Sequence, residues 1–215
     1  MLVSAKICGL TRPEDAALAA THGAWRLGVV FAGGPRMVTV TQAAAIIRVA
    51  RGVPVLGVFG VRPLGTILDI MERAGLAGAQ LHGEHPPETA SELRTRGYEV
   101  WRVVPIDLAT DLAAELGAAA DGADAVAIEA RVPGGAGGRG VGIALDLARA
   151  ARAAVPRARF VLAGGLGPDS VRRAIEVVGP DVVDVSSGIE SSPGIKDPER
   201  LACFLENVLA ARSAA

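Results

Sequence analysis

The stretch Lys6-Ile7-Cys8-Gly9-Leu10-Thr11-Arg12-Pro13-Glu14-Asp15 leads from a short apolar run straight into a helix start. Gly9 permits backbone angles that a side chain disfavours. Thr11 is the expected helix N-cap, with Pro13 and two acidic residues in the first turn behind it. We therefore predict that Cys8 lies at the carboxyl end of a first strand and faces a helix N-terminus. Parallel α/β proteins place their chemistry at such strand ends.

The same strand-to-helix unit recurs from one end of the chain to the other. Continuous Val, Ile and Leu runs predict strands at residues 3–8, 27–31, 55–59, 79–81, 99–104, 123–128, 159–163 and 182–186. Helices are expected at residues 13–21, 41–51, 63–74, 86–95, 110–119, 143–153, 168–177 and 197–211. About eight such units predict an α/β fold, a single-domain (β/α)8 TIM barrel over residues 1–215. A doubly wound open sheet is the alternative, but it seldom needs so many units in so few residues.

The composition bounds the class of protein. Half of the 215 residues are hydrophobic and the formal charge is −1. One sizeable core is therefore expected, and nothing favours nucleic acid or an anionic membrane as a partner. We find neither a run of about 20 apolar residues nor a signal-peptide pattern. The two cysteines, Cys8 and Cys203, lack the spacing of a disulfide framework, which suits a reducing cytosol and predicts a cytoplasmic protein.

The two cysteines invite different interpretations. A lone cysteine in an apolar run is usually a buried small hydrophobe. Cys8, however, stands at an expected strand end beside Lys6 and before a helix start, and positive potential there favours the thiolate. Cys203 stands in the middle of an expected helix among apolar neighbours. We expect Cys203 to contribute to packing only.

Two loops after the seventh and eighth expected strands predict a phosphate site. The first contains Gly164 and Gly165, and the second contains Ser186, Ser187 and Gly188. Backbone N–H groups exposed in such loops bind a phosphate without any basic side chain. In a (β/α)8 barrel these two loops form the recurrent phosphate site. A small phosphorylated substrate is therefore expected.

Three other strand ends carry side chains suited to proton transfer or anion binding. His82 follows the fourth expected strand, although a single histidine is more often structural than catalytic. Arg36 follows the second and could bind a carboxylate bidentately, although most loop arginines are solvated. Glu129 ends the sixth, beside a glycine-rich loop at residues 133–140, which indicates either an acid/base group under a mobile cover or an ordinary surface loop. No metal-ligand spacing and no P-loop or dinucleotide motif in its proper context is found, so no cofactor is expected.

Several motifs follow one another along the chain in a familiar order. They are Lys6-Ile7-Cys8-Gly9-Leu10-Thr11, Gln80-Leu81-His82-Gly83-Glu84, Ala163-Gly164-Gly165-Leu166, Asp184-Val185-Ser186-Ser187-Gly188-Ile189-Glu190 and Pro193-Gly194-Ile195-Lys196-Asp197. Together they resemble the phosphoribosylanthranilate isomerase family, from the first expected strand to the last helix. The resemblance implies a (β/α)8 barrel. It also implies an Amadori rearrangement of N-(5-phosphoribosyl)anthranilate to 1-(2-carboxyphenylamino)-1-deoxyribulose 5-phosphate in tryptophan biosynthesis, without metal or organic cofactor.

The resemblance also implies roles for individual residues. Cys8 matches the family's general base, and Glu129 stands where the family has an aspartate as general acid. The implied substrate contacts are Lys6, Arg36, His82 and Asp184, with Arg36 meeting the anthranilate carboxylate. The implied partner is a small phosphorylated substrate that carries this carboxylate, and the implied assembly is a monomer or homodimer.

The chain departs from the family pattern near the acid. The extra methylene of Glu129 moves its carboxyl group by about 1–1.5 Å on a fixed backbone, and such a misplacement can cost about a hundredfold in rate. Residues 137–142 lack the family's lysine, aromatic residue and tryptophan, and Gly34 replaces a serine. Two alternatives therefore stay open: an isomerase of a different N-glycosyl phosphate, and a degenerate barrel that binds a phosphorylated metabolite without turnover. A related histidine-biosynthesis isomerase is disfavoured by Cys8, since its catalytic pair is two aspartates.

Overall fold

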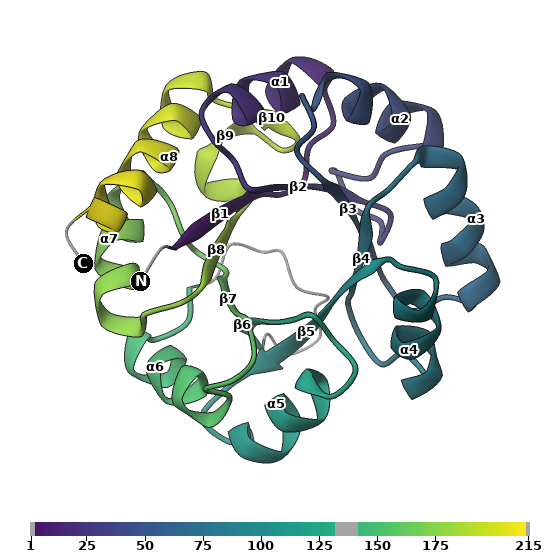
Figure 1. Ribbon diagram of the computed structural model, residues 1–215. Helices are drawn as coiled ribbons and strands as arrows, with labels where there is room; N and C mark the ends of the chain where they lie inside the picture. Colours follow the sequence, from purple (N-terminus) through teal and green to yellow (C-terminus); the bar gives the residue numbers. More distant parts are fainter. Residues whose placement is uncertain (1–2, 132–141, 214–215) are drawn as a thin grey trace.

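Parallel strands close into a barrel surrounded by helices (Figure 1). The computed structural model describes residues 3–131 and 142–213. Each barrel strand in this part of the chain pairs with the next in sequence, and β8 (Val182–Val185) pairs with β1 (Ser4–Ile7). An open, doubly wound sheet leaves two edge strands unpaired, so the closure rules out that alternative. The predicted single-domain (β/α)8 TIM barrel is confirmed.

Strands and helices alternate around the barrel as the sequence predicts. The remaining barrel strands are β2 (Arg26–Val30), β3 (Val55–Phe59), β4 (Gly78–Leu81), β5 (Glu99–Ile106), β6 (Ala125–Ala130) and β7 (Phe160–Ala163). The helices are α1 (Pro13–Thr21), α2 (Val40–Val49), α3 (Leu64–Ala74), α4 (Pro87–Thr95), α5 (Leu112–Ala120), α6 (Leu145–Ala154), α7 (Pro168–Val178) and α8 (Pro198–Ser213). Observed and expected ends differ by at most two residues. None of the helices in the described ranges is long and apolar enough to cross a bilayer.

The interior of the barrel is built in layers, because residues two apart on a strand share a face. One layer is apolar and contains Trp101, Ala125 and Val182, which are almost fully buried. Two steps of two residues along β6 lead from Ala125 to Glu129, and one such step along β8 leads from Val182 to Asp184. The candidate site residues Glu129 and Asp184 therefore lie between this apolar layer and the carboxyl ends of the strands. A larger apolar cluster packs the outer face of the sheet against the helices.

An additional hairpin follows β8 and is not foreseen by the strand-to-helix pattern. A 3₁₀ turn (Ser187–Ile189) leads into β9 (Glu190–Ser192), which pairs antiparallel with β10 (Ile195–Lys196). Figure 1 shows this β9–β10 hairpin beside α1. It connects the end of the barrel sheet to α8.

Helix α1 begins differently from the expectation. Its N-cap residue is Arg12, and no side chain accepts a capping hydrogen bond there. The hydroxyl of Thr11 donates instead to the carbonyl oxygen of Gly194 in the β9–β10 hairpin. The predicted Thr11 cap is therefore wrong, because a partner 183 residues away in sequence engages that hydroxyl.

Cys203 is exposed on α8, so the expectation that it packs is wrong. The buried face of α8 passes through Leu201, Phe204, Leu205 and Val208, which is the spacing of one helix face. Residue 203 falls outside this stripe. An apolar neighbourhood in sequence therefore did not indicate burial on the helix.

Candidate active site

A cavity of about 540 Å³ lies at the carboxyl ends of the barrel strands. Most of the residues singled out in the sequence line it: Cys8, Arg36, His82, Glu129, Gly164, Gly165, Asp184, Ser186 and Ser187. Lys6 and Gly188 are outside the lining. The closed barrel thus brings strand ends that are far apart in sequence to one cavity. The expected cover at residues 133–140 lies outside the described residues.

Lys6 lies behind the wall of the cavity. Its side chain is fully buried, and its Nζ is 2.8 Å from Oδ2 of Asp184. Burial lowers the pKa of Lys6, but the opposing effects of Asp184 and the Cys8 thiol raise it overall. The ammonium group has no exposed surface in this structure, and its ion-pair partner is the Asp184 carboxylate. Lys6 thus fixes Asp184 and supplies positive charge next to Cys8.

Cys8 is 9 % exposed and lines the cavity. Burial raises the pKa of the Cys8 thiol, and Asp184 raises it further, whereas Lys6 and Lys196 lower it. The net direction is upward. Lys6 therefore favours the thiolate, as the sequence predicts, but burial outweighs the attraction of the lysine.

Gly28 on β2 leaves the space that Cys8 and Lys6 occupy. A Cβ atom at this position would lie 2.9 Å from Sγ of Cys8, and 3.1 and 3.2 Å from Cε and Nζ of Lys6. We expect Gly28→Ala to displace the thiol and to lower kcat by about a hundredfold in steady-state assays. Gly65→Ala is the matched control, since a Cβ there meets nothing within 4 Å. A Gly28→Ala enzyme with the kcat of the control would show that the thiol tolerates the displacement.

Glu129 and His82 form a pair at the cavity wall. Nε2 of His82 is 2.5 Å from Oε1 of Glu129, and the side chains are 22 % and 13 % exposed. The hydrogen bond to Glu129 raises the pKa of His82, although burial works in the opposite direction. The contact with Glu129 thus favours the protonated form of His82 at the surface of the cavity. This is the arrangement that a general acid requires.

Arg36 lines the cavity but already has a carboxylate partner. Its Nε and Nη2 donate to Oε1 and Oε2 of Glu190 at 2.8 and 2.7 Å. Such a fork leaves the Nη1 edge of the guanidinium for another anion, since it has no acceptor among the described residues. Arg36 is therefore a paired arginine with one free edge, and not an isolated cation.

The two predicted phosphate loops meet at the same end of the cavity. Gly164 and Gly165 have φ angles of 89° and 67°, in the left-handed region that glycine tolerates. Gly188 is required for close approach, because a Cβ on it would lie 1.9 Å from the carbonyl oxygen of Leu166. Ser186 and Ser187 complete the lining. Gly188 thus joins the two loops instead of facing the cavity.

Three polar oxygens on the cavity wall have no hydrogen-bond partner within the described ranges. They belong to Gln80, Asp184 and Ser186: Oε1, Oδ1 and Oγ respectively. Buried polar atoms are normally paired, so these atoms are suited to hydroxyl or N–H groups of a ligand. Gln80 was not among the predicted site residues. Its position two residues before His82, on the same strand face, was the signal that could have found it.

Within the described residues, no cluster of three or more His, Cys, Asp or Glu side chains could hold a metal ion. Glu190 and Lys196 were also missed as residues that matter to the site. They lie in the β9–β10 hairpin, which the sequence analysis did not predict.

The comparisons with known proteins decide the family. The model of the family described as N-(5'phosphoribosyl)anthranilate (PRA) isomerase matches residues 5–207. This chain belongs to that family. The N-(5'-phosphoribosyl)anthranilate isomerase of Geobacter sulfurreducens is 41 % identical over 209 residues, which are 95 % of this chain and 97 % of that protein.

Solved structures agree with the family assignment. Monomers generated from the dimeric phosphoribosylanthranilate isomerase of Thermotoga maritima superpose with a TM-score of 0.81 at 31 % identity, covering 97 % of this chain and 99 % of that one. A phosphoribosyl anthranilate isomerase in complex with reduced 1-(o-carboxyphenylamino)-1-deoxyribulose 5-phosphate superposes with a TM-score of 0.83, at the same identity and coverage.

Proposed function

We propose that this chain isomerises N-(5'-phosphoribosyl)anthranilate in tryptophan biosynthesis, with Cys8 as general base and the Glu129–His82 pair as proton source. It is an aldose–ketose isomerase by its family. The observation that carries the assignment of residues is that Cys8 on β1 and Glu129 on β6 line one cavity, whose other end is formed by the two glycine loops. A base, an acid and a phosphate site are thus available to one small ligand.

The chemistry needs one proton to be delivered and one to be removed. Protonation of the furanose ring oxygen breaks the C1–O bond and leaves a Schiff base between C1 and the anthranilate nitrogen. Removal of the C2 proton then forms an enolamine, which tautomerises to the ketone. The Glu129–His82 pair holds a proton for the first step. Cys8 accepts the C2 proton once its thiol has ionised.

The two ends of the substrate are bound by different chemistry. Backbone groups around Gly164, Gly165 and Ser187 bind the phosphate, as expected for loops after the last strands of such a barrel. The free edge of Arg36 binds the anthranilate carboxylate. The unpartnered oxygens of Gln80 and Asp184 are available to the ribose hydroxyls. The site therefore suits a small anionic ligand as its partner, and neither a nucleic acid nor a membrane. We propose that the protein acts as a monomer or a homodimer.

A steady-state assay with N-(5'-phosphoribosyl)anthranilate tests the proposal. We expect saturable turnover by the wild-type protein and none above background for the Cys8→Ala, Glu129→Ala double variant. The double variant should still bind the reduced product analogue, because the phosphate loops are unchanged. Equal rates for the two proteins would refute the assignment, and binding of the analogue by a wild type without turnover would indicate a degenerate barrel.

A further inference from the structure

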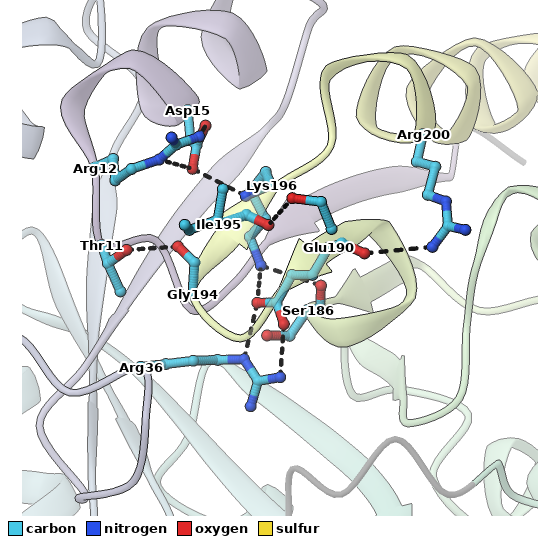
Figure 2. Close-up of polar contacts among 11 residues, drawn as sticks. Thr11, Arg12, Asp15, Arg36, Ser186, Glu190, Gly194, Ile195, Lys196 and Arg200 are labelled. Atoms are coloured by element: carbon cyan, nitrogen blue, oxygen red, sulfur yellow. Dashed lines mark hydrogen bonds and ion pairs between the residues drawn. The ribbon is translucent and has the colours of Figure 1, made fainter.

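Across the Glu190 carboxylate from Arg36 lies a second cation. Lys196 on β10 is 1 % exposed and does not line the cavity. Its Nζ donates to Oε1 of Glu190 at 2.9 Å and to the carbonyl oxygen of Ser186 at 3.1 Å. Figure 2 shows Arg36 and Lys196 meeting the Glu190 carboxylate from two sides. Arg36, Glu190 and Lys196 form what we call the hairpin charge cluster.

The position of Lys196 is fixed by the turn that carries it. Its backbone N–H donates to Oδ2 of Asp15 at 3.1 Å, and Asp15 is itself held by Arg12. The hydroxyl of Thr11 binds the carbonyl oxygen of Gly194 in the same hairpin (Figure 2). The β9–β10 hairpin is therefore tied to Asp15 on α1 and to Thr11 just before this helix. These contacts hold the backbone of Lys196, and its Nζ is held by Glu190 and the carbonyl oxygen of Ser186.

The charge of the cluster depends on Lys196. Burial raises the pKa of Glu190, but Arg36 and Lys196 outweigh burial and lower it overall, so the carboxylate is ionised. Arg36 and Glu190 alone then form a neutral pair, and a neutral pair attracts a second carboxylate weakly. The ammonium group, which donates to two oxygens, brings the cluster to a net charge of +1.

We propose that Lys196 determines the affinity for the substrate's carboxylate without touching it, by keeping the hairpin charge cluster cationic. The inference rests on the proposed role of Arg36 as the carboxylate site. It makes Lys196 a positioning and charge-balancing residue, and it gives the β9–β10 hairpin a function in substrate specificity. The phosphate end of the substrate should be affected much less, because backbone groups bind it.

Two ligands separate the carboxylate effect from the rest. One is reduced 1-(2-carboxyphenylamino)-1-deoxyribulose 5-phosphate, and the other is its phenylamino analogue, which lacks the carboxylate. In calorimetric titrations, we expect Lys196→Met to raise the dissociation constant of the first ligand by about tenfold or more, because a nearby buried charge is lost. The dissociation constant of the second ligand should rise by about twofold at most. The readout is the dissociation constant of the phenylamino analogue divided by that of the carboxylate ligand, which we call the preference ratio. A general loss of structure would weaken the binding of both ligands and leave this ratio unchanged.

A double variant adds a test of charge balance. In Lys196→Met, Glu190→Gln the only remaining charge of the cluster is Arg36, so the net charge returns to +1. We expect this variant to recover most of the lost preference for the carboxylate ligand. The role of Lys196 would be overturned if Lys196→Met had the preference ratio of the wild type. It would also be overturned if the double variant had a lower preference ratio than Lys196→Met. A wild type that does not prefer the carboxylate ligand would overturn the role of Arg36 as well.

A pH titration covers the case in which Lys196→Met does not fold. The charged groups around Lys196 are Glu190 on β9, Asp184 on β8, Arg36 from the β2–α2 loop, Arg200 on α8, Asp15 on α1 and the thiol of Cys8. Burial lowers the pKa of Lys196, so it loses its charge earlier than an ordinary lysine as pH rises. In a Cys8→Ser background, which removes the thiol's titration, the preference should fall as pH rises towards about 10.4, the ordinary pKa of lysine. A constant preference up to that pH would contradict the proposal.

Discussion

Replacing Cys8 by alanine is expected to lower kcat by about a thousandfold, which is the usual effect of losing a general base. The thiol lines the cavity, and only its ionised form can take the C2 proton. Because burial raises the pKa of Cys8, the wild-type kcat/KM should rise with pH as the thiol ionises. In Cys8→Ala this ascending limb should be absent. Steady-state kinetics over a range of pH measure both effects.

The chain contains its own control for this experiment. Cys203 is exposed on α8, far from the cavity lining, so Cys203→Ala removes a thiol without altering the site. We expect wild-type kcat for Cys203→Ala, and for Cys8→Ala a wild-type circular dichroism spectrum with binding of the reduced product analogue. A Cys8→Ala enzyme that keeps more than about a tenth of the wild-type kcat would show that another group is the base.

The barrel itself was predictable because its signals are local. Most strands are short apolar runs such as Val55–Phe59, and a proline or small polar residue opens several of the helices that follow them. Parallel pairing then follows from the alternation, since the intervening helix returns the chain to the same edge. The hairpin at Glu190–Lys196 was not predictable in this way, because its two short strands are partly polar and pair only with each other.

The positions of the site residues were predictable, but their partners were not. Cys8 and Glu129 stand at strand ends, and a closed barrel brings all strand ends to one face. The contacts of Arg36 with Glu190 join residues 154 apart in sequence, and no local pattern encodes them. For the same reason, the sequence did not show that burial would outweigh Lys6 in setting the pKa of Cys8.

Replacing Glu129 by glutamine is expected to lower kcat by about a hundredfold to ten-thousandfold, because an amide of the same shape cannot relay a proton between His82 and the ring oxygen. The hydrogen bond that raises the pKa of His82 would weaken as well. The descending alkaline limb of kcat should therefore move to lower pH in Glu129→Gln, since His82 then loses its proton earlier. Rates measured at saturating substrate over a range of pH test both statements.

Glu84→Gln provides the matched control, because Glu84 is an exposed glutamate two residues after His82 and does not line the cavity. It should leave both kcat and the alkaline limb unchanged.

Glu129→Asp gives a finer test. In the wild type the Glu129 carboxylate is 2.5 Å from His82, and the shorter aspartate side chain withdraws the carboxyl group from this contact. We expect Glu129→Asp to be slower than wild type, because a misplacement of about 1 Å can cost about a hundredfold. Wild-type rates in Glu129→Gln would instead assign proton delivery to His82 or to another group on the cavity wall.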